Sequence, residues 1–194
     1  MPFIPLRHIL SSRTAHRLGF GFTLQELLTT LTVVAAMASL ATPPLQQLIT
    51  KNRQSAAMNT FTAALYTTRS EAMKRGTRAV LCPSRNGRDC VGSGNDETVW
   101  SEGYLVFVDQ NGNHERDSDE EIVRVFDRIR GIRIRSSQYR EYVSYQPNGL
   151  ARGTNATFQF CSERSAIPVR SLVMSNTGRV RVAPPATTPS TCPM

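Results

Sequence analysis

The stretch Gly21-Phe22-Thr23-Leu24-Gln25-Glu26-Leu27-Leu28 decides the fold, because the composition of the chain changes abruptly within it. The residues before it contain three arginines and no acidic residue. After Glu26, the next charged residue is Lys51. An uncharged helical run of about 20 residues or more is long enough to cross a bilayer. We therefore expect a leader at 1–21 and the transmembrane half of a helix at 22–48.

Glu26 needs an explanation, since a carboxylate inside a membrane span costs about 2.5 to 3.5 kcal/mol on insertion scales unless it is paired. A cut between Gly21 and Phe22 would create a cationic α-amine at the same depth. That amine on a neighbouring copy would neutralise Glu26 and fix the axial stagger between subunits. The alternative is a carboxylate that lies close enough to the membrane interface to reach water.

The same octapeptide, behind a basic leader and ahead of an apolar run, resembles the prepilin processing motif of type IV pilins and type II secretion pseudopilins. The resemblance implies that a prepilin peptidase cleaves between Gly21 and Phe22 and methylates the Phe22 amine, and that Glu26 acts in assembly. It also implies a single-pass protein of the cell inner membrane, with its C-terminal domain in the periplasm. Such a protein joins other pilin or pseudopilin subunits in a pilus or pseudopilus. Gln25 departs from the motif, which usually has an aliphatic residue there.

A secretory signal peptide is the competing interpretation of the N-terminal third. Its cut site would follow the apolar run, in a pattern of small residues such as that at 36–41. Here that pattern leads straight into further helical periodicity. We therefore rank removal at this point second.

Helical periodicity continues beyond the apolar run and predicts a stripe that packs against a sheet. The residues of this stripe recur at spacings of three and four: Met58, Phe61, Leu65, Thr68 and Ala72. Glu71 and Arg75 are spaced to support the last turns, and Gly76 predicts the end of the helix.

After Gly76, short runs rich in β-branched and aromatic residues predict strands. They lie at 79–82, 104–108, 122–126, 132–135, 142–145, 158–161, 170–174 and 179–182. We predict an α+β fold like that of type IV pilins, in which a long N-terminal helix packs on an antiparallel β-sheet through its amphipathic half. The globular periplasmic domain would occupy 49–183, and an irregular Pro- and Thr-rich tail would occupy 184–194.

Four cysteines, with no histidine nearby to suggest a metal site, indicate two disulfides in an oxidising compartment. Three pairings are possible. We favour Cys82 with Cys90 and Cys161 with Cys192, because local closure is the simplest arrangement. The second bond would tie the tail to the domain through Cys192.

The formal net charge of +8 is carried almost entirely by arginine, and it is uneven along the chain. Between Ile122 and Val182 there are eleven arginines and three acidic residues. Between Asp96 and Glu121 there are nine acidic residues and one arginine. A polyanionic partner is therefore expected at the C-terminal half.

Two Arg-x-Arg pairs lie in predicted strands and suggest where such a partner binds. Residues i and i+2 of a strand share a face, so the arginines of each pair would point outward while Val180 and Val182 face the core. Gly178 would allow a tight turn and bring the backbone close to a phosphate. This surface would bind the backbone of double-stranded DNA without base specificity, and its residues are Gly178, Arg179, Arg181, Arg133, Arg135, Arg128 and Arg130. The alternative is an ordinary solvated strand face.

The body of the chain resembles the GspH/FimT family of minor pilins and pseudopilins, through 100–109, Ile122-Val123-Arg124 and Gly178-Arg179-Val180-Arg181. The last of these resembles the GRxR motif of FimT-type pilins, which is associated with DNA uptake in natural transformation. The first interpretation is therefore a FimT-like minor type IV pilin that acts in pilus assembly and binds DNA. The alternative is a GspH-type pseudopilin of the type II secretion system, a structural subunit without a DNA role.

Nothing in the sequence favours catalysis. His114 is the one histidine outside the leader, and no nucleophile motif, phosphate-binding glycine loop or zinc spacing accompanies it. Residues 109–120 carry oxygen-bearing side chains at the ligand positions of a calcium loop, but its sixth position holds His114 instead of glycine, and Arg116 adds a competing cation. We expect a solvated acidic turn, with no enzymatic activity, cofactor or metal.

Overall fold

The computed structural model describes residues 21–92, 99–136, 140–163 and 167–184, without the side chains of 40–44 and 99. The predicted leader, except Gly21, and the predicted tail, except Pro184, lie outside these residues. The chain divides into two units, Met1–Thr42 and Pro43–Met194. Helix α1, Leu24–Arg75, begins in the first unit and ends in the second.

The first unit contains the start of α1. Thr23 is the N-cap, because its Oγ1 accepts a hydrogen bond from the backbone N–H of Glu26 at 3.2 Å. The spacing Thr-x-x-Glu is that of a capping box, and a carboxylate suits the positive end of the helix dipole. The helix begins two residues after the predicted start at Phe22. Within the described ranges, no helix has the length and the apolar character that crossing a membrane requires.

In the second unit, α1 supplies the centre of the hydrophobic core. The predicted stripe is buried, with Met58 at 3% exposure and Phe61, Leu65, Thr68 and Ala72 at 0%. The centroid of the Phe61 ring lies 4.6 to 5.8 Å from those of four other rings, Trp100, Tyr104, Phe158 and Phe160. The helix ends before Gly76, whose φ of 65° lies in the left-handed region that glycine favours. The predicted stripe and helix end are confirmed.

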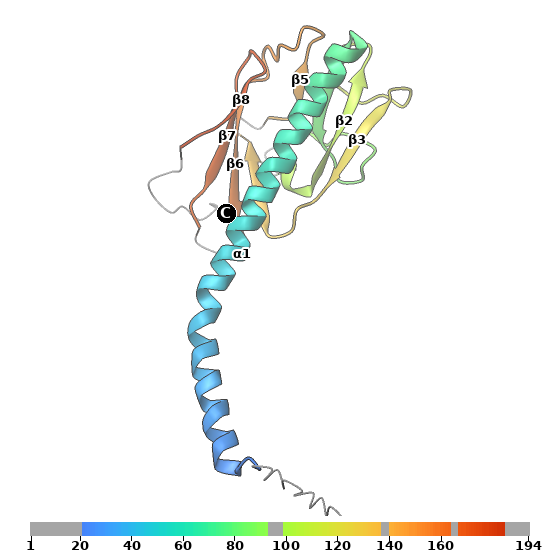
Figure 1. Ribbon diagram of the computed structural model, residues 1–194. Coiled ribbons are helices and arrows are strands. Elements are labelled where there is room, and N and C mark those ends of the chain that lie inside the picture. The colour runs from blue at the N-terminus through green and yellow to red at the C-terminus, as the bar shows by residue number, and fades with distance from the viewer. Residues whose placement is uncertain (1–20, 93–98, 137–139, 164–166, 185–194) are drawn as a thin grey trace, which may run out of the picture. The chain divides into compact units, whose positions relative to one another are not determined.

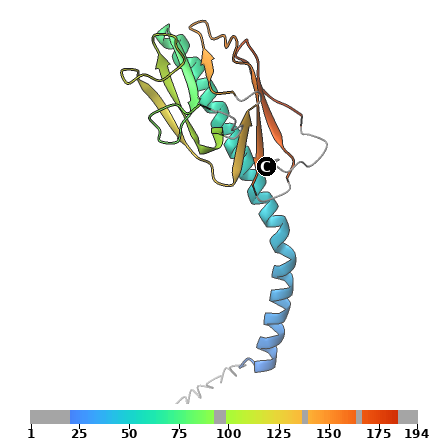
Figure 2. The ribbon, with the colours of Figure 1, turned by 180° about the vertical axis from the view of Figure 1, so that it is seen from behind.

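Strands form at all eight predicted places, but they make two antiparallel sheets instead of the one we expected. The first sheet has the order β3-β2-β1-β5 and contains β1 (Arg78–Pro83), β2 (Gly103–Asp109), β3 (Ile122–Asp127) and β5 (Val143–Tyr145). The second has the order β4-β6-β7-β8 and contains β4 (Ile132–Ser136), β6 (Ala156–Ser162), β7 (Arg170–Met174) and β8 (Val180–Val182). Figures 1 and 2 show from two sides that the strands flank the C-terminal half of α1, and both sheets share one buried cluster with it.

The two sheets are joined by a short 3-10 helix that the sequence did not predict, η1 (Val99–Glu102). Trp100 is fully buried, and its Nε1 donates a hydrogen bond to the backbone oxygen of Arg140 at 2.7 Å. Ser101 Oγ accepts a hydrogen bond from the backbone N–H of Ile134 at 2.8 Å. The residues that lead into β2 of the first sheet are therefore bonded directly to β4 of the second.

The core lies entirely within the second unit. Every buried hydrophobic or polar side chain of the described residues lies between Gln54 and Met174. A fragment of residues 43–194 retains all of these side chains, so we expect it to fold without the first unit.

Candidate assembly and nucleic-acid sites

The predicted processing and assembly residues lie at the start of the first unit. Phe22 is 83% exposed, and Glu26 is exposed in the first turn of α1. No described residue makes an ion pair with the Glu26 carboxylate. Cleavage between Gly21 and Phe22, methylation of Phe22 and the assembly role of Glu26 stay predictions.

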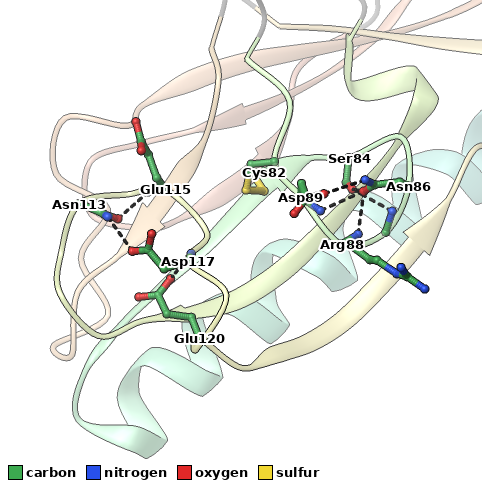
Figure 3. The surroundings of a disulfide bond; sticks show 11 residues. Cys82, Ser84, Asn86, Arg88, Asp89, Asn113, Glu115, Asp117 and Glu120 are labelled. Atoms are coloured by element: carbon green, nitrogen blue, oxygen red, sulfur yellow. Dashed lines mark hydrogen bonds between the residues drawn. A yellow bond between two sulfur atoms is a disulfide. The ribbon is translucent and has the colours of Figure 1, made fainter.

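A disulfide joins Cys82 to Cys90 and closes the loop that follows β1, with a Cα–Cα distance of 5.6 Å. Inside this loop, Asn86 Oδ1 accepts hydrogen bonds from the backbone N–H groups of Arg88 and Asp89, both at 2.9 Å (Figure 3). Cys161 is also disulfide-bonded. Its predicted partner, Cys192, lies outside the described residues.

In the acidic loop between β2 and β3, many carboxylate oxygens accept hydrogen bonds from N–H groups of the same loop. The Asp109 carboxylate accepts hydrogen bonds from the backbone N–H groups of Gly112 and His114, at 2.7 and 3.3 Å. Asp117 accepts hydrogen bonds from the side-chain amides of Asn111 and Asn113, and Glu120 accepts them from the backbone N–H groups of Gln110 and Asp117 (Figure 3). In the part of the chain that the structure describes, no group of His, Cys, Asp and Glu side chains could hold a metal ion.

His114 has a structural place in this loop. Its φ is 66°, at the position where a calcium loop has glycine. The ring stacks on Tyr142 with centroids 4.6 Å apart, and its Nε2 lies 3.0 Å from Nη1 of Arg78. Burial and the positive charge of Arg78 lower the pKa of His114, which favours the neutral ring as acceptor for Arg78. This geometry fixes the loop onto β1.

Strand register puts three of the predicted DNA-binding arginines on one face of the second sheet. Arg135 of β4 is paired with Gln159 of β6. On β6, Thr157 lies two residues before Gln159 and therefore on the same face. Thr157 is paired with Val173 of β7, and Val173 is paired with Arg181 of β8. Arg133 shares this face by alternation. Because β4 and β8 are the two edges, the arginines are separated by three strand spacings, about 14 Å.

Arg128 and Arg130 do not share that face, and their part in DNA binding stays a prediction. They lie in the turn between β3 and β4, where they line an open groove with Arg53 and Arg85. Arg53 and Arg85 were missed altogether, because they lie on a helix face and in a loop far apart in the sequence.

The β7–β8 hairpin also differs from the prediction. Val182 is 54% exposed instead of buried, although it is paired with the buried Leu172, because β8 is an edge strand. Gly178 is buried, its N–H donates to the backbone oxygen of Ser175, and its carbonyl accepts from Arg69 Nη1 at 3.2 Å. Both polar backbone groups of Gly178 are thus used within the chain. Gly178 positions the hairpin and is not open to a phosphate.

A family model described as Type II transport protein GspH matches residues 57–178. The chain belongs to the GspH family. Among solved structures, this GspH-family chain is similar to the type IV minor pilin FimU of Pseudomonas aeruginosa (strain PAO1), with a TM-score of 0.55 and 20% sequence identity over 72% of this chain and 97% of that one. A second crystal form of FimU gives a TM-score of 0.47 and 18% identity over 74% and 99% of the two chains. No curated protein sequence matches the chain significantly.

The family and the fold agree with the sequence-based expectation. The GspH-family chain has the α+β pilin fold. At 20% sequence identity, the likeness to FimU shows this fold. By family it is related to type II transport protein GspH, and by fold it is a pilin-like chain.

Gly178 and Gly153 make a matched pair for testing the hairpin contact, since their φ angles are 75° and 76°. A Cβ at Gly178 would lie 2.5 Å from the oxygen of Gly149 and 2.9 Å from Cε1 of Tyr145, whereas a Cβ at Gly153 would meet nothing within 4 Å. Each Gly→Ala change should lower the free energy of unfolding by about 1 to 2 kcal/mol, because alanine disfavours a left-handed backbone. Gly178→Ala should lower the free energy of unfolding by roughly a further 1 to 3 kcal/mol, because its new methyl group overpacks the site.

Urea unfolding of the 43–194 fragment measures this difference in the free energy of unfolding. Equal losses for Gly178→Ala and Gly153→Ala would show that Gly178 is not held by Gly149 and Tyr145.

Proposed function

We propose that this chain is a FimT-like minor subunit of a type IV pilus, made as a precursor, trimmed by a prepilin peptidase and held in the inner membrane by residues 22–48 before assembly. The observation that supports this most is Glu26, an exposed carboxylate in the first turn of α1 with no described partner. It lies four residues after Phe22, which would be the first residue of the trimmed chain.

The physical argument is charge pairing in an apolar environment. A carboxylate among packed helices is costly unless an opposite charge meets it. Trimming after Gly21 supplies a cationic α-amine on Phe22. The amine of one subunit then pairs with Glu26 of its neighbour, and the pair sets the stagger between subunits.

Glu26→Ala should therefore abolish incorporation into filaments, because no carboxylate remains to meet the neighbouring amine. The neighbouring substitution Gln25→Ala is the control and should leave incorporation unchanged. Filaments sheared from cells that carry each variant, probed for this subunit against total membrane protein, give the measurement. Normal incorporation of Glu26→Ala would contradict the proposed pairing.

DNA binding is the second part of the proposal. Arg133, Arg135 and Arg181 share a sheet face, and Arg179 is exposed just before β8. The guanidinium groups at the two edges could contact phosphates of one duplex, with the neutral side chains of Gln159 and Val173 between them. Such contacts carry no base specificity.

If four arginines contact phosphates, log Kd for duplex DNA should change with log salt concentration with a slope of magnitude about 3.6. Replacing Arg179 and Arg181 together by alanine should weaken binding and lower that magnitude by about 1.8. Arg152→Ala, an exposed arginine in the loop before β6, is the control. Fluorescence anisotropy of the 43–194 fragment with duplex DNA measures both quantities. A Kd that does not change with salt concentration, or an equal Kd for the double variant, would contradict DNA binding by these arginines.

A pseudopilin of the type II secretion system is the second candidate, and the family description favours it. It is also favoured by Glu163, whose Oε1 lies 3.8 Å from Nε of Arg133 and partly neutralises the arginine face. This candidate shares the processing and assembly steps and predicts no DNA binding. The salt titration therefore separates the two.

A further inference from the structure

An open groove lies between α1 and the turn that follows β3, with a volume of about 1090 Å³. Its helix wall consists of residues at spacings of three and four, which share one face of α1: Gln46, Ile49, Thr50 and Arg53. All of its lining residues belong to the second unit. The groove therefore lies on the part of α1 where the proposed membrane span 22–48 ends.

The groove has an excess of cationic groups. Arg128 is paired, because its guanidinium group lies 3.8 Å from Glu102 and 3.5 Å from Glu163. Within the described residues, no ion pair or hydrogen bond is made by the other three lining guanidinium groups, those of Arg53, Arg85 and Arg130. Asp127 is the lining acid that remains to offset these three. The groove therefore offers positive charge to an anionic ligand.

Exposed apolar side chains lie next to these arginines on α1. Leu45, Leu48 and Ile49 are 56%, 55% and 44% exposed, and Ile49 lines the groove. Leu45, Ile49 and Arg53 are four residues apart, so apolar surface leads directly to a cation along one helix face. A ligand with an anionic head and an apolar tail matches this order. DNA offers phosphates but no apolar tail to cover Leu45 and Ile49.

The distance along α1 suits a phospholipid of the proposed membrane. Arg53 is five residues beyond Leu48, the last residue of the proposed span, so the two are about 8 Å apart along the helix axis. The headgroup layer of a bilayer is about 5 to 8 Å thick on each side of the hydrocarbon core. Arg53 would therefore lie at the level of the lipid phosphates, and Leu45 and Ile49 at the boundary with the acyl chains.

We propose that the groove binds the headgroup of an anionic phospholipid, with its phosphate at Arg53, Arg85 and Arg130 and an acyl chain against Leu45 and Ile49. The bound lipid holds the globular domain at the membrane surface before the chain enters a filament. The place of the groove at the membrane rests on the proposed function, in which residues 22–48 are the anchor. An anionic membrane strengthens binding about fivefold for each arginine near its surface, so three arginines give about 100-fold.

Binding of the 43–194 fragment to vesicles tests this site, because the fragment contains the whole groove and every buried side chain of the described core. Affinity is measured by co-sedimentation with vesicles of equimolar phosphatidylglycerol and phosphatidylcholine, and with vesicles of phosphatidylcholine alone. The fragment should bind the mixed vesicles about 100-fold more tightly than the neutral ones. Salt is kept at about 0.1 M, where charges more than about 10 Å apart are largely screened.

Two variants of equal net charge separate the groove from the general positive charge of the fragment. The groove variant, Arg53→Gln with Arg130→Gln, should bind the mixed vesicles about 25-fold more weakly. The control variant, Lys74→Gln with Arg152→Gln, should bind as the unmodified fragment does. Lys74 is in the last turn of α1, about 32 Å along the helix from Arg53, and the loop that holds Arg152 packs against the last two turns. Circular dichroism establishes that each variant is folded.

The apolar part of the site has its own test. Leu45→Ser with Ile49→Ser keeps every cation and should still weaken binding to the mixed vesicles about tenfold, because less apolar surface then leaves water. Both side chains are exposed, so the core is unaffected. Soluble glycerol phosphate carries the anionic group without acyl chains and should not displace the fragment from the vesicles.

Equal binding to the two kinds of vesicle, equal affinities of the groove and control variants, or full binding by the Leu45 and Ile49 variant would overturn the inference. Displacement by glycerol phosphate would also overturn it and assign the groove to a soluble phosphate. A groove variant that loses duplex DNA binding but keeps vesicle binding would overturn it in favour of nucleic acid.

None of these outcomes bears on trimming at Gly21 or on Glu26, because the fragment lacks both residues. Failure of the lipid site is therefore distinguishable from failure of the proposed function.

Discussion

The packing of one helical stripe against two sheets is the constraint on which the rest of the structure depends. Phe61 contacts rings from η1, β2 and β6, so both sheets must converge on the same turn of α1. Loss of a buried aromatic ring costs about 3 to 5 kcal/mol, a large share of the stability of a domain of this size. This convergence fixes the direction of each strand and determines which side chains remain outside.

The surfaces that we associate with function consist of side chains that this packing leaves exposed. Ile132 and Ile134 are buried in the core, so Arg133 and Arg135 must face away from it. β2 runs through the core from end to end, so the charged groups that flank it are collected at its two ends. The first turn of α1 lies outside the core-forming residues, and Glu26 there has no described partner. The helix thus serves the fold with one half and, in the proposed function, assembly with the other.

Periodicity predicted the elements well because it reflects which side chains are buried. The stripe from Met58 to Ala72 was found in this way, and all eight strand positions were found from short runs rich in β-branched and aromatic residues. Alternation does not encode which strands pair, so the division into two sheets and the junction at η1 could not be predicted. The same limit explains Val182, whose exposure depends on being at a sheet edge, and Arg130, whose place depends on the groove. The tight turn at Gly178 was predicted, but the partners that require glycine there come from distant residues.

In the proposed function, the N-terminus is trimmed before the carboxylate of Glu26 pairs with the amine of a neighbouring subunit. Intact-mass and N-terminal peptide analysis of the chain purified from membranes tests this most directly. The account predicts a mature chain that begins at Phe22 and carries one methyl group on its α-amine. A mature chain that retains the residues before Phe22, or one cut after the apolar run, would contradict it.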